Sequence, residues 1–68
     1  MPIKLAEQTT GAHTFMRLRL PSGRVEEIDV YWRENGPHYV TSADHFPDNP
    51  MHPQGLREEI IAAFEALY

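Results

Sequence analysis

Two alternating stretches that flank a turn sequence constrain this chain more than any other feature. Residues 14–33 read TFMRLRLPSGRVEEIDVYWR, and apolar and basic residues alternate strictly from Met16 to Leu20. Successive side chains of a β-strand point to opposite faces, so Arg17 and Arg19 share the face opposite the apolar residues. The pattern predicts a strand that is buried on one side and open on the other.

The second stretch, residues 27–33, completes the predicted hairpin. It is rich in β-branched and aromatic residues, which are typical of strands, and it alternates in the same way. The apolar face should carry Ile28, Val30 and Trp32, so the single tryptophan is expected in the core. The opposite face should carry Glu27, Asp29, Tyr31 and Arg33.

Parity restricts the connection at Pro21-Ser22-Gly23, because directly opposed residues of antiparallel strands share a face. A loop of three residues pairs Met16 with Ile28, whereas a loop of five pairs Leu18 with Ile28. Both alternatives keep the apolar faces together and set arginines opposite carboxylates on the other face. A two-residue loop would set an apolar residue opposite a carboxylate, and it is therefore excluded.

The flanks of this hairpin are less strongly specified. Residues 34–37 read Glu-Asn-Gly-Pro, a turn signal that predicts a third strand over residues 38–41. Residues 1–12 form either a fourth, edge strand or a loose N-terminal arm, and both alternatives stay open. The register of the third strand is also open, with Tyr39 opposite Trp32 or Val40 opposite Val30.

Residues 53–68 predict a C-terminal helix. Proline is favoured at a first helical position, and apolar residues recur at spacings of three and four along the segment. Ile61 and Tyr68 lie beside this stripe and widen the apolar surface beyond what one sheet face requires. The stripe itself consists of Leu56, Ile60, Ala63, Phe64 and Leu67.

Residues 42–52 contain two prolines and no periodicity, so they are predicted to form a long loop held down by Phe46 and Met51. Imidazole and carboxylate groups in this loop are ligand types that zinc accepts. Because prolines interrupt their spacing, a polar turn-rich loop is the simpler interpretation. The candidate metal ligands are Asp44, His45, Asp48 and His52.

Composition and pattern together predict one small α+β domain over residues 1–68. A three-stranded antiparallel meander spans residues 13–41, with residues 1–12 as an optional fourth strand, and the helix packs on one face. The chain has no cysteine, no secretory signal and no apolar run near the roughly 20 residues of a membrane span, so a cytoplasmic protein without membrane contact is expected. The net charge of −4 argues against a nucleic-acid backbone as main partner.

The uncovered sheet face is the predicted binding surface, because aromatic and arginine side chains are enriched at protein–protein interfaces. We expect a small non-enzymatic module without a cofactor, an inhibitor or accessory protein that contacts a protein partner and forms a homodimer. Small acidic proteins of phages and mobile elements offer an analogy of size and charge alone. The candidate partner-binding residues are Phe15, Arg17, Arg19, Tyr31, Arg33 and Tyr68.

Two alternatives use the same residues differently. Phe15, Arg17, Arg19 and Tyr31 could stack on and ion-pair with single-stranded nucleic acid, although the interleaved carboxylates disfavour it. The loop from Asp44 to His52 could hold a metal ion. No nucleophile, base and orienting group are placed together, and the four glycines are isolated, so neither a hydrolytic site nor a phosphate loop is predicted.

Overall fold

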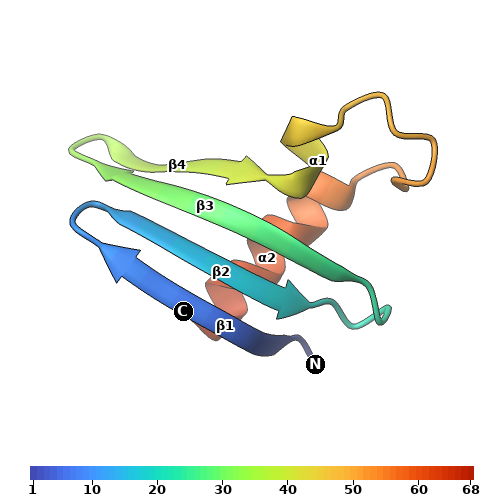
Figure 1. The fold of residues 1–68 in the computed structure, drawn as a ribbon, viewed down its shortest axis with the longest axis horizontal. Helices are drawn as coiled ribbons and strands as arrows, with labels where there is room; N and C mark the ends of the chain where they lie inside the picture. The colour runs from blue at the N-terminus through green and yellow to red at the C-terminus, as the bar shows by residue number, and fades with distance from the viewer.

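In the computed structural model, which describes residues 1–68, four antiparallel strands form one sheet in the order β1-β2-β3-β4. The C-terminal helix α2 lies behind this sheet and crosses β2, β3 and β4 (Figure 1). The predicted α+β class is therefore confirmed, and residues 3–10 form a fourth strand rather than a loose arm. The elements are β1 Ile3–Thr10, β2 His13–Arg19, β3 Val25–Arg33, β4 Gly36–Thr41, α1 Ser42–His45 and α2 Leu56–Leu67.

The central hairpin has the register of the three-residue loop. Met16 lies opposite Ile28. The backbone N–H of Leu20 donates to the carbonyl of Arg24, and the N–H of Gly23 donates to the carbonyl of Leu20, both at 2.8 Å. Gly23 takes a φ of +97°, a left-handed conformation that glycine adopts without steric penalty. The alternative with a five-residue loop is wrong, because Leu20 bonds to Arg24 and leaves only the three residues 21–23 in the loop.

The second hairpin differs from both registers that the sequence left open. Tyr39 lies opposite Val30, and His38 lies opposite Tyr31. The turn residues are Glu34 and Asn35, followed by Gly36 with a φ of +114°. A type I′ turn centred on Asn-Gly would need a positive φ at the asparagine, which no non-glycine residue of the chain has.

The core lies between the inner sheet face and α2. Its polar anchor is Thr14, which is fully buried and whose hydroxyl accepts a hydrogen bond from the Trp32 indole N–H at 2.9 Å. Trp32 packs against the core, as its place beside Ile28 and Val30 predicts. The buried apolar residues are Met16, Leu18, Leu20, Ile28, Val30, Leu56, Ile60, Ala63 and Phe64.

Two boundaries near the C-terminus differ from prediction. The predicted loop 42–52 opens with the one-turn helix α1, whose N-cap Thr41 and Asp44 form a reciprocal capping box. Helix α2 begins at Leu56 rather than at residue 53, because Gly55 at the N-cap position has a φ of +80°. Phe46 and Met51 do not hold the loop down, since both are largely exposed.

Neither helix combines the length and the apolar character that crossing a membrane requires.

Candidate functional site

The sheet face turned away from α2 carries no covering element, and we call it the open face (Figure 1). Residues of the four strands meet on it in rows, because strand register aligns them across the sheet. The structure brings five of the six predicted partner-binding residues to this face. It carries Phe15, Arg17, Arg19, Val25, Glu27, Asp29, Tyr31, Arg33, His38, Val40 and His13.

The most regular feature of the open face is an aromatic row formed by His13, Tyr31 and His38. The rings of His13 and Tyr31 stack with centroids 4.8 Å apart and an interplanar angle of 24°. The ring of His38 lies 6.3 Å from Tyr31 on the other side and is tilted by 45°. Tyr31 is therefore held between two imidazoles and presents an ordered aromatic surface.

Sequence reasoning missed both histidines of this aromatic row. Strand parity alone was sufficient to place His13 on the same sheet face as Phe15, because the two residues are two positions apart in the strand. The partner of His38 could not be predicted, because it depends on which residues form the turn between β3 and β4. The sequence predicted a turn centred on Asn35 and Gly36, whereas the observed turn residues are Glu34 and Asn35, and this turn sets His38 opposite Tyr31.

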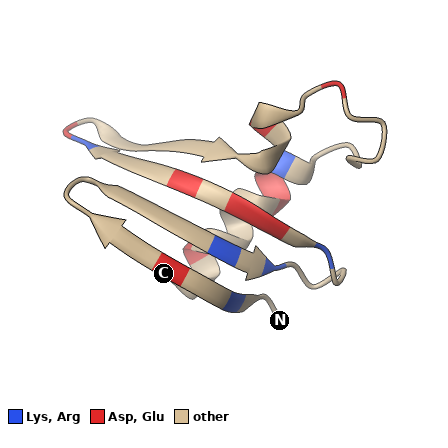
Figure 2. Ribbon diagram, in the orientation of Figure 1, with Lys and Arg blue, Asp and Glu red and all other residues tan.

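Charges on the open face are interleaved but not balanced. Arg17 pairs with Glu27 at 3.2 Å, and His13 Nε2 lies 2.7 Å from an oxygen of Asp29. Figure 2 shows this pattern as basic positions on β2 beside acidic positions on β3. Three arginines therefore face two carboxylates, and the open face has a small positive surplus in a chain of net charge −4. The arginines without an ion-pair partner are Arg19 and Arg33.

Tyr68, the sixth predicted residue, lies in the helix layer on the opposite side of the sheet. Its ring stacks on Phe64 at 5.0 Å and lies 5.3 Å from Trp32. The side chain is 61% exposed, so one side of the ring covers the core and the other faces solvent. Tyr68 is therefore separated from the open face and lies on the helix side of the sheet.

The four candidate metal ligands are not gathered into a site. No group of three or more histidine or acidic side chains has an arrangement that could hold an ion. Asp44 is already occupied by its capping box and by Arg57 Nε, which donates to it at 3.0 Å. His52 lies beside Asn49, 3.5 Å from its amide nitrogen.

The two groups with clearly shifted pKa values, Tyr39 of β4 and Asp44 of α1, lie on the helix side of the sheet. Burial alone would raise the pKa of Asp44, but hydrogen bonds from Thr41 and the charge of Arg57 outweigh burial and lower it. Burial, a hydrogen bond to Glu65 and the charge of Glu65 all raise the pKa of Tyr39. Both shifts have structural causes, and neither group lies on the open face.

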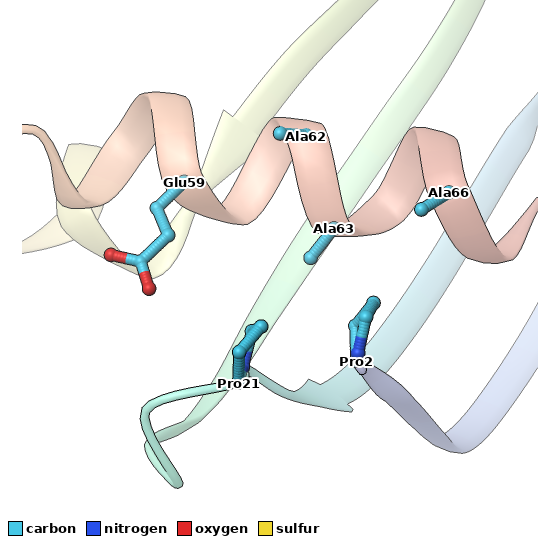
Figure 3. A pocket seen from close by; sticks show the side chains of 6 residues that line it. All are labelled: Pro2, Pro21, Glu59, Ala62, Ala63 and Ala66. Atoms are coloured by element: carbon cyan, nitrogen blue, oxygen red, sulfur yellow. The ribbon is translucent and has the colours of Figure 1, made fainter.

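Cavities also lie on the helix side rather than on the open face. One of about 220 Å³ lies between the start of β1, the β2–β3 turn and α2 (Figure 3). A second, of about 300 Å³, lies between α1, the following loop and the start of α2. The open face has no hollow for a small molecule, and its flatness suits contact with a macromolecule.

No protein-family model, curated protein or solved structure matches this chain. Function therefore has to be inferred from the surfaces of the chain itself.

Proposed function

We propose that this chain is a non-enzymatic protein-binding module whose open face contacts an acidic surface of a partner protein. The observation that supports the proposal is the aromatic row of His13, Tyr31 and His38 on an uncovered sheet face that also carries two unpaired arginines. Aromatic and arginine side chains are the types that dominate binding energy at protein interfaces.

Electrostatics supports an acidic partner. Arg19 and Arg33 carry charges that no carboxylate of the chain neutralises, whereas eight of the ten acidic residues and only three of the six basic ones lie away from the open face. An acidic surface would be attracted to the open face and repelled by the rest of the molecule, so charge would orient the encounter. The binding should therefore weaken as salt rises.

The size and charge of the chain suit a cytoplasmic inhibitor or accessory protein, which works by covering a surface of its partner. We extend the proposal to a homodimer, because a domain of 68 residues buries only about 60% of its unfolded surface and gains stability from association. Both parts are open to separate experiments.

The test is capture of a partner from a lysate of the source cells with three immobilised proteins. The wild type should retain a partner, and Tyr31→Ala should lose it, because truncation of an interface hot spot costs about 2 kcal/mol or more, roughly 30-fold in affinity. Tyr68→Ala is the matched control, since it removes a tyrosine from the opposite layer. Equal retention by both variants would contradict the proposal, and circular dichroism checks that each variant is folded.

Single-stranded nucleic acid is the second candidate, favoured by the stacked ring of Tyr31 and by Arg17 on the same face. Asp29 and Glu27 lie within the same surface and oppose phosphate binding. Titration with labelled oligonucleotides at low salt distinguishes the two functions. Binding that is lost on Arg17→Ala and weakens steeply with salt would favour nucleic acid, whereas no binding would leave the protein partner as the proposed function.

A further inference from the structure

Strand β1 is an open edge of the sheet. It pairs with β2 on one side only, and all eight of its residues are exposed. Helix α2 makes its main contacts with the other three strands, and although its C-terminal end reaches behind β1 (Figure 1), no residue of β1 is buried. Ile3 and Leu5 are 48% and 42% exposed along this edge. An unpaired strand edge offers backbone N–H and C=O groups to another strand.

The opposite edge of the sheet, β4, is protected in ways that β1 is not. Pro37 removes one backbone donor there. Arg57 Nη2 donates to the carbonyl of Tyr39 at 3.3 Å and so occupies an acceptor of β4. Residues 3–10 contain no proline, and their side-chain hydrogen bonds leave the backbone of the strand free. The two edges therefore differ, and β1 is the one open to pairing.

The β-bulge between Lys4 and Ala6 gives β1 an unusual charge arrangement. Lys4 lies opposite Leu18 and Glu7 lies opposite Met16, so the extra residue brings both charges to the helix-side face. They form an ion pair of 2.8 Å. An edge lysine normally discourages strand pairing, but here a carboxylate on the same strand neutralises it.

This arrangement is self-complementary under a two-fold axis. Two copies of β1 paired antiparallel about the point between Leu5 and Ala6 would set Lys4 of each copy opposite Glu7 of the other. The bulge makes this register consistent, because Lys4 and Glu7 share a face although their numbers differ in parity. Ile3 and Gln8, which both point to the open face, would also lie opposite each other.

We infer that β1 is the self-association surface of the chain, and that a second copy pairs with it antiparallel to make a continuous eight-stranded sheet. This inference rests on the proposed homodimer and gives it a location. Both helices would lie on one side of the joined sheet. Ala62 and Ala66 of α2, beside the cavity next to Pro2, leave room for the second copy to approach (Figure 3).

The size of this edge predicts a weak dimer. In this register the six residues Ile3 to Gln8 pair across the axis; at about 3.3 Å each they give a length of roughly 20 Å, and the molecule is 16 Å deep in its shortest direction. The edge therefore offers roughly 320 Å² per copy, about 40% of what a standard stable interface buries on each side. We expect a dimer that dissociates on dilution and leaves both open faces free.

The test uses opposite charge reversals and sedimentation velocity from about 10 μM to about 1 mM, a range that covers weak complexes. Wild-type protein should shift from monomer to dimer. Lys4→Glu alone and Glu7→Lys alone should each weaken the association by about tenfold or more, because like charges then face each other. An equimolar mixture of the two variants should recover the dimer, since opposite charges again meet across the axis.

Three results would overturn the inference: a wild type that stays monomeric throughout, single variants that dimerise like wild type, or a mixture that does not recover. Tyr31→Ala serves as the control, because a change on the open face should leave the β1 dimer intact. The assay needs no partner protein. Its failure would therefore be separate from a failure of the open face to bind a partner.

Discussion

The buried hydrogen bond between Thr14 and Trp32 gives the sharpest prediction about stability. Thr14→Val keeps the shape of the side chain but removes the oxygen that accepts the indole N–H at 2.9 Å. The variant leaves the N–H of a partly buried tryptophan without its acceptor. An unsatisfied buried donor costs about 1–3 kcal/mol, and partial access of water to Trp32 places the expected loss near 1–2 kcal/mol.

For a domain of this size each kcal/mol lowers Tm by about 4–8 °C, so the variant should melt about 5–15 °C below wild type. Thermal and urea unfolding followed by far-ultraviolet circular dichroism measure the loss. Thr10→Val is the matched control, since Thr10 is an exposed threonine of the same hairpin and its change should stay within about 0.5 kcal/mol.

A double-mutant cycle with Trp32→Phe isolates the hydrogen bond. In that background Thr14→Val should cost about 1 kcal/mol less than in the wild type, because the indole donor is already absent and only the hydrogen bond between Thr14 and Thr9 is lost. The same loss in both backgrounds would refute the assignment of Thr14 as the anchor of Trp32. So would a Thr14→Val variant as stable as wild type.

Two further predictions concern pH. Because the folded pKa of Asp44 is lowered, this residue contributes stability that is full above its ordinary pKa of about 4 and is lost as pH falls through the lowered value. In a plot of the urea unfolding midpoint against pH, Asp44→Asn should therefore make the decline at acid pH less steep. A decline as steep as in the wild type would contradict the roles of Thr41 and Arg57. Because burial and Glu65 raise the pKa of Tyr39, its contribution is full below about 10 and is lost as pH rises through the raised value. Glu65→Gln should lower the Tyr39 midpoint in an ultraviolet titration of tyrosinate, and a midpoint that does not move would contradict the contact.

The central hairpin and the apolar stripe of α2 were predictable, because both follow from regular periods. A period of two assigned Arg17 and Tyr31 to one face whichever loop length was used. Strand β1 was harder, since the bulge at Leu5 interrupts the alternation and exposure of both faces removes the apolar pattern. The sequence of such an edge strand therefore predicts a strand only weakly.

Turn and cap geometry account for the remaining differences. The Asn35-Gly36 sequence fits two turn types that differ by one residue in register, and φ at each position decides between them. Helix α1 depends on a capping box with aspartate at its third position, a weaker signal than glutamate or glutamine. Within the candidate site, the positions of the arginines could be predicted from the sequence, whereas the contact of His38 with Tyr31 could not.

The most direct test of the open face is chemical-shift mapping by NMR as the captured partner is added. Perturbations should gather on β2 and β3 around His13, Phe15, Asp29 and Tyr31, and amides of α2 should stay unchanged. Loss of the perturbations at high salt is expected for an acidic partner. Shifts confined to α2, or to the loop between α1 and α2, would contradict the claim that the open face is the binding surface.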